Sequence, residues 1–112
     1  MQPQPVNREI LLEAAISPAK EIDHVTVQRI TMQPNTVGGA HIHSEPLLGA
    51  IVSGSAILQI EGQSEKTLQP GDAFYEPAGI TIAHFSAGSE GVVFLAYSLL
   101  GSGEEPHITM SI

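Results

Sequence analysis

Two histidines stand one residue apart in the segment GGAHIHSEP, residues 38–46. In a β-strand, residues i and i+2 point to the same face, so the imidazoles of His41 and His43 would lie side by side. Neutral imidazoles are common ligands of divalent transition metals. The spacing therefore indicates a metal site, provided that the segment is extended and faces a cavity rather than water.

The composition narrows the classes of partner. Twelve acidic residues stand against four basic ones, giving a formal net charge of −8, and there is no basic run. This charge argues against binding to nucleic acid or to an anionic membrane. The chain has no cysteine, which excludes disulfides and thiolate metal sites. Residues 1–20 lack the pattern of a signal peptide and no segment is long enough to span a membrane, so we expect a cytoplasmic protein.

Short apolar and β-branched runs, separated by turn-forming residues, predict an all-β antiparallel sandwich or barrel. The 112 residues, 42% of them hydrophobic, suit one domain with a buried core. Residues 8–16 could form a helix by propensity, although Pro18 limits it and an edge strand is as compatible. We expect a single domain over residues 1–112, with residues 1–20 as an N-terminal arm or edge strand. The predicted strands are residues 22–33, 40–43, 47–53, 55–61, 67–69, 73–76, 80–85 and 92–99.

The alternation of side chains predicts what surrounds the two imidazoles. If His41 and His43 point inward, the same parity carries Leu47, Gly49 and Ile51 inward, and in the segment ITIAHF the alternate set includes Ile82. The segment VVFLAYSL is apolar on both faces and should be buried on both sides. A small-molecule pocket with aliphatic walls is expected. Its predicted lining residues are Leu47, Gly49, Ile51, Ile82 and Phe94.

The segments GGAHIHSEPLLGAIVSG and PGDAFYEPAG resemble the two motifs of the cupin superfamily of small β-barrels. Gly54 matches the closing glycine of the first motif, and Gly71, Pro77 and Gly79 match the frame of the second. The resemblance covers nearly the whole chain. It implies a cupin-type antiparallel β-barrel or jelly roll.

The chain departs from the cupin pattern at two ligand positions. Complete cupin sites use two histidines and a glutamate from the first motif and one histidine from the second. Here Leu47 stands at the glutamate position and Ile82 at the last histidine position. His84 lies two residues beyond Ile82 and would keep the inward face of a regular strand, and Glu45 lies two residues before Leu47. The resulting ligand set is His41, His43 and His84, with Glu45 as a candidate fourth ligand.

Two classes of function follow from this set. In the first, a divalent ion of iron, manganese, nickel, zinc or copper acts as a Lewis acid or an oxygen-activating centre. Some cupin dioxygenases that use three histidines resemble this arrangement, which implies an oxygenase or isomerase acting on a small organic acid or carbonyl compound. In the second, the barrel holds no metal and binds a small apolar ligand without catalysis. An aliphatic residue at position 82 favours the second class, because it makes the cavity drier.

The remaining expectations concern three other polar residues and the oligomeric state of the chain. Glu76, just before Pro77, is a candidate general base at the barrel mouth, but we expect it at the surface. His24 is expected to be solvated or hydrogen-bonded, and His107 to be exposed. A barrel this small leaves apolar edge strands that need a cover. We expect a homodimer, with residues 9–16 as the cover or as an arm that crosses to the partner subunit.

Overall fold

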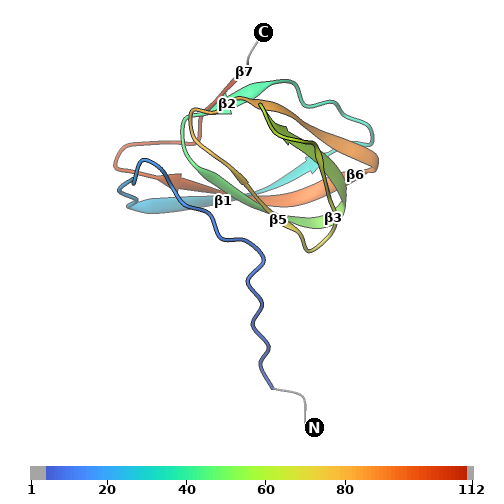
Figure 1. The fold of residues 1–112 in the computed structure, drawn as a ribbon, viewed down its shortest axis with the longest axis horizontal. Helices are drawn as coiled ribbons and strands as arrows, with labels where there is room; N and C mark the ends of the chain where they lie inside the picture. The colour runs from blue at the N-terminus through green and yellow to red at the C-terminus, as the bar shows by residue number, and fades with distance from the viewer. Residues whose placement is uncertain (1–4, 111–112) are drawn as a thin grey trace.

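A computed structural model describes residues 5–110, so the first four residues of the predicted arm and the last two of the chain lie outside the described part. The described residues form an antiparallel β-barrel (Figure 1), which confirms the predicted all-β class. They contain no helix that is long and apolar enough to cross a membrane. The strands are β1 (His24–Met32), β2 (His41–His43), β3 (Leu47–Ile60), β4 (Lys66–Leu68), β5 (Ala73–Glu76), β6 (Ile82–Leu100) and β7 (Ile108–Met110).

Two long strands, β3 and β6, form the frame of the barrel and pair with each other along most of their length. Each joins two segments that the sequence predicts as separate strands. The β3–β6 pairing shifts register at Gly54, whose φ is +75° and whose added Cβ would lie 2.1 Å from the carbonyl oxygen of Gly91. Glycine therefore lets β3 pass this point as a bulge instead of ending in a turn.

The remaining strands attach to this frame. The order β4-β3-β6-β2-β7 describes the main sheet, with β1 also paired to β6 and β5 also paired to β3. The short strand β2, which carries both histidines, therefore lies between β6 and the C-terminal strand β7. This arrangement presents one side of β2 to the barrel interior.

The barrel interior is filled by aliphatic side chains around three phenylalanines. The rings of Phe74, Phe85 and Phe94 have centroids 4.8–5.9 Å apart, which is the range of favourable aromatic pairs. Gly49 lies directly opposite Phe74, and an added Cβ there would come 2.0 Å from the ring. Gly49 therefore makes room for the aromatic cluster. Ile51 is also part of the core, with 3% exposure.

The N-terminal segment forms an extended arm that projects from the barrel (Figure 1). Residues 8–16 are neither helix nor strand, so both expectations for this segment are wrong. Isolated helices of fewer than roughly 12 residues are marginally stable in water unless one side packs against the rest of the protein. Residues 8–16 are largely exposed, so no such packing stabilises a helix here. Its apolar side chains remain largely exposed, as in Ile10 and Leu11.

Candidate metal centre

The two histidines of β2 point into the barrel together. His41 is 6% and His43 is 9% exposed, and their rings meet edge to face with centroids 4.9 Å apart. In the strand ladder, His41 lies opposite Ile82 of β6 and Met110 of β7. The i, i+2 spacing thus brings the two imidazoles into one site.

The third group of the site is Glu76, at the end of β5. Its Oε1 lies 2.8 Å from Nε2 of His43 and 3.1 Å from Nε2 of His41, and the residue is 3% exposed. The potential ligand atoms of these three residues all lie within 4.8 Å of one another. The expected surface position of Glu76 is therefore wrong. The signal that could have located it is the alternation of β5, where Phe74 and Glu76 share the inward face.

Glu76 also offers a carboxylate in place of the motif glutamate that this chain lacks at position 47. It pairs directly with Leu47 in the β3–β5 ladder. Directly opposite residues of an antiparallel pair lie on the same face, with Cβ atoms about 4.5–5.5 Å apart. The carboxylate absent at position 47 is thus supplied from the neighbouring strand.

The hydrogen bonds of His41 show that this site suits a cation. Nδ1 of His41 donates to the carbonyl oxygen of Gly39 at 2.9 Å, so a neutral ring carries a lone pair on Nε2. That Nε2 faces a carboxylate oxygen of Glu76, which is also an acceptor. Either the ring is an imidazolium, or a cation takes the place of the Nε2 proton. Two imidazoles and one carboxylate form a donor set that fits a divalent transition metal.

The pKa shifts of His41 and Glu76 also indicate a site that suits a cation. Burial disfavours the charged form of His41, but its hydrogen bonds with Glu76 and with the Gly39 carbonyl outweigh this effect and raise the pKa of His41. Burial likewise opposes ionisation of Glu76, but the bonds to both imidazoles prevail and lower the pKa of Glu76. The carboxylate therefore stays ionised at neutral pH and can attract a cation.

The structure places His84 outside this cluster. The β3–β6 ladder pairs Gln59 with His84 and Ile60 with Ile82, so β6 holds one extra residue at this point. This bulge reverses the inward–outward alternation and turns the His84 ring away from the interior. Nε2 of His84 lies 2.9 Å from a carboxylate oxygen of Glu65 near the surface. Ile82 is fully buried, so the second-motif position contributes packing.

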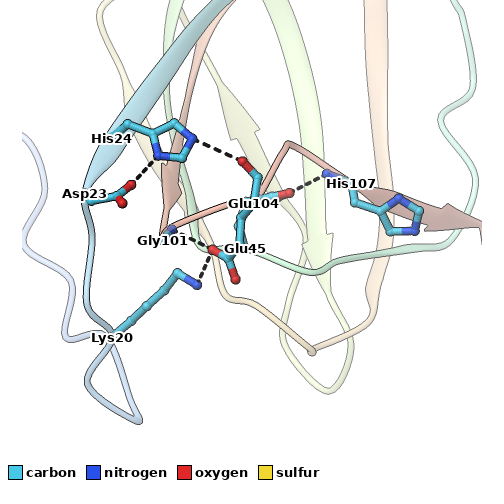
Figure 2. A network of polar contacts seen from close by, with 7 residues as sticks. All are labelled: Lys20, Asp23, His24, Glu45, Gly101, Glu104 and His107. Carbon is cyan, nitrogen blue, oxygen red and sulfur yellow. Dashed lines mark hydrogen bonds and ion pairs between the residues drawn. The ribbon is translucent and has the colours of Figure 1, made fainter.

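Glu45 also lies outside the cluster, although it is only 2% exposed. Its Oε1 accepts a hydrogen bond of 2.6 Å from the backbone N–H of His107, as Figure 2 shows. In the same view, the carboxylate of Glu104 accepts from Nζ of Lys20 at 2.7 Å, and its carbonyl oxygen contacts the ring of His24. These contacts hold the segment before β7 against the body of the protein, so the role of Glu45 in the structure is to anchor the C-terminal segment.

A cavity of about 250 Å³ adjoins the cluster. Of the five residues expected to line a pocket, Leu47 and Phe94 line this cavity, whereas Gly49, Ile51 and Ile82 do not and are buried. The volume lies a little below the usual range of ligand pockets, about 300–1,000 Å³, and therefore suits a small organic molecule. The other apolar walls are Ile30, Met32, Phe85, Ile108 and Met110.

Comparison with solved structures supports the cupin-type fold. A structure reported with the DMSP lyases RdDddP and RnDddQII is 26% identical, with a TM-score of 0.62 over 79% of this chain and 43% of that one. An oxalate decarboxylase of Bacillus subtilis, described for its Mn(II) centres, is 25% identical, with a TM-score of 0.64 over 71% and 22%. A cupin-like protein of Thermotoga maritima is 18% identical, with a TM-score of 0.64 over 78% and 65%.

The chain spans less than half the length of the lyase and decarboxylase chains that it matches. No curated protein sequence matches it. The family comparison identifies a cupin domain (Cupin_2) over residues 28–98. This range runs from β1 into β6 and includes both histidines of β2 and Glu76 of β5. The chain therefore belongs to the cupin family.

Proposed function

We propose that this protein binds a divalent transition metal through Nε2 of His41, Nε2 of His43 and the carboxylate of Glu76. The observation that carries the proposal is the His41 ring, which lies between two acceptors, the Gly39 carbonyl and Glu76. A cation beside Nε2 would turn this unfavourable contact into coordination. Compared with the set expected from the sequence, Glu76 replaces His84, and Glu45 is left out.

Iron(II) and manganese(II) are the ions that we favour. Two histidines and one carboxylate, with further coordination positions open, are typical of non-haem iron(II) oxygenases. The similar oxalate decarboxylase is described for its Mn(II) centres, which supports manganese as the second candidate. A resident ion of this kind would supply Lewis acidity or oxygen activation.

The reaction that we propose is metal-dependent oxygenation or isomerisation of a small organic acid or carbonyl compound. The chain's own residues would hold the ion, and the apolar walls around Leu47 and Phe94 would exclude water from the substrate. A small carboxylate could reach the open side of the cluster through the cavity of about 250 Å³. The partners that we propose are this small molecule and, in a homodimer, a second copy of the chain.

Metal analysis of purified variants tests the ligand set. We expect close to one metal ion per chain in the wild type, and its loss in His41→Ala and Glu76→Gln. His84→Ala is the matched control, since it removes an imidazole outside the cluster, and it should keep the metal. Retention of metal in Glu76→Gln together with its loss in His84→Ala would instead support the three-histidine site.

A second candidate function is the binding of a small apolar ligand without metal. The observation that favours it is the cavity wall, which is apolar apart from the cluster itself and two glycines. An apolar fluorescent probe should then bind the protein equally well with and without a chelator. A wild-type protein that binds no iron or manganese at any tested concentration, but does bind the probe, would favour this function over the first.

A further inference from the structure

Glu45 is buried, and one of its two carboxylate oxygens has no partner. The residue is 2% exposed, and its Oε1 accepts the hydrogen bond from the backbone N–H of His107 (Figure 2). Its Oε2 is closed to water and accepts no hydrogen bond from the described residues. Buried polar atoms are nearly always hydrogen-bonded, because an unpaired one is costly to the fold. The position of Oε2 therefore indicates that a hydrogen-bond donor is missing.

Glu45 lines a cavity of about 270 Å³, which we call the Glu45 cavity. It adjoins the cavity beside the metal centre, because four residues line both: Ile30, His43, Leu47 and Ile108. A ligand in the Glu45 cavity therefore lies next to an imidazole that belongs to the metal centre. The two cavities together offer one molecule two different binding groups, the metal centre and the carboxylate of Glu45.

The chemistry of the Glu45 cavity selects the group that binds there. None of its lining residues is a lysine or an arginine, and Glu45 forms no ion pair within residues 5–110. In the part of the chain that the structure describes, the only group of three potential metal ligands is the one at the metal centre, so a second metal ion is not favoured. A primary ammonium group brings both an N–H donor and a positive charge, which are the two things that this carboxylate lacks.

The separation of Glu45 from the metal centre suits a short ligand. Glu45 lies two residues beyond His43, which limits the distance between their Cα atoms to about 7 Å. The terminal torsion of a glutamate side chain is broad, so a turn of the carboxyl group can bring Oε2 to a donor in the cavity. The net charge of −8 also favours the approach of a cationic group.

We propose that the Glu45 cavity binds the ammonium end of a small amino acid whose carboxylate extends to the metal centre. This inference rests on the proposed metal site, and it narrows the substrate from small organic acids to those that carry a primary amine close to the acid group. Glu45 then has two tasks, since Oε1 holds the segment before β7 through His107 and Oε2 recognises the ligand. Glu45 is a specificity-determining residue in this arrangement.

Calorimetric titration of the manganese-loaded protein tests this specificity. The probes are glycine, β-alanine and 4-aminobutyrate, each compared with the acid of the same chain length without the amine: acetate, propionate and butyrate. The best-fitting amino acid should bind about 10–100-fold more tightly than its parent acid, which is the contribution of one hydrogen bond to a charged group. The hydroxyl and trimethylammonium analogues of that amino acid should bind less tightly than it does, because the first lacks the charge and the second lacks the N–H donor.

Glu45→Gln is the variant that separates recognition from folding. Its amide oxygen can still accept from the N–H of His107, whereas its NH₂ group replaces Oε2 and opposes an ammonium group. The variant should keep the circular dichroism spectrum and the metal content of the wild type but lose the preference for the amino acid. Glu105→Gln is the matched control, since it removes an exposed carboxylate from the same segment, and it should keep the preference. An amino acid that binds no better than its parent acid, or a preference that survives in Glu45→Gln, overturns the proposal.

Titration with butylamine in the presence of a chelator distinguishes this site from the metal site. Metal-free wild type should bind butylamine about 10-fold or more tightly than metal-free Glu45→Gln. A wild type that loads no metal but shows this difference contradicts the proposed metal site and supports Glu45 as the ammonium-binding group. A wild type that loads metal but shows no difference contradicts the role of Glu45 and leaves the metal site standing.

Discussion

Exchanging the residues at positions 47 and 76 tests the central claim about the metal centre. Leu47 and Glu76 are direct partners in the β3–β5 ladder and share the inward face. Glu76→Leu should abolish metal binding, because it removes one of three proposed ligands. The double variant Glu76→Leu/Leu47→Glu should restore it, because a carboxylate at position 47 begins only about 5 Å away from its original position.

The structure sets the expected size of both effects. Glu76 is the one anionic group among the three proposed ligands, and its Oε1 lies 2.8 and 3.1 Å from the two imidazole Nε2 atoms. Losing even an outer partner of a metal ligand typically costs about 10–100-fold in metal affinity. Loss of the carboxylate itself should therefore weaken metal affinity at least about 100-fold, which corresponds to roughly 2.7 kcal/mol. The ligand atoms of the cluster lie within 4.8 Å of one another, a span that the glutamate side chain can bridge from position 47. We expect the double variant to recover to within about tenfold of the wild type.

Calorimetric titration with manganese(II) under anaerobic conditions measures these affinities directly. Leu47→Glu alone serves as the control for the added charge, and circular dichroism checks that each variant keeps its β structure. If the folded double variant binds metal no better than Glu76→Leu, the two positions do not serve the same site. The argument from the strand ladder would then be refuted.

Further predictions concern stability and the cavity. In metal-free protein, the lowered pKa of Glu76 gives stability that is lost as pH falls below about 4.5, and the raised pKa of His41 gives stability that is lost as pH rises above about 6.5. The free energy of unfolding, measured with denaturant in the presence of a chelator, should therefore be highest between these two pH values. Glu76→Gln should flatten this maximum. Gly49→Ala should cost about 1–3 kcal/mol in urea unfolding, because its Cβ would meet the Phe74 ring at 2.0 Å. Phe94→Ala should cost about 3–5 kcal/mol and let the enlarged cavity bind a bulkier apolar probe, as measured by fluorescence titration.

The position of His84 outside the cluster, where the sequence favoured it as a ligand, has a specific structural cause. Counting two residues on from Ile82 keeps a side chain on one face only in a regular strand. The extra residue that β6 inserts opposite Gln59 and Ile60 changes the count by one. Nothing in the segment ITIAHF marks this bulge, because it arises from the way that β3 and β6 bend around each other in the barrel.

Glu76 was missed for a different reason. Its alternation with Phe74 on β5 was visible in the sequence, but a glutamate before a proline is most often solvated. Only the pairing of β5 with β3 brings it opposite Leu47 and against the two histidines. A contact between residues far apart in the chain depends on strand register, and register is set by long-range packing.

The sequence by itself determined the all-β class, the cupin motifs and the placement of His41 and His43 on one face of a strand, because these depend on local alternation and on turn-forming residues. It also indicated that residues 92–99 form a strand that is apolar on both faces. The tertiary structure alone decided which carboxylate joins the histidines, that His84 turns outward, and that the N-terminal arm stays extended. Each of these outcomes depends on register, bulges and packing between distant strands, which no short segment encodes.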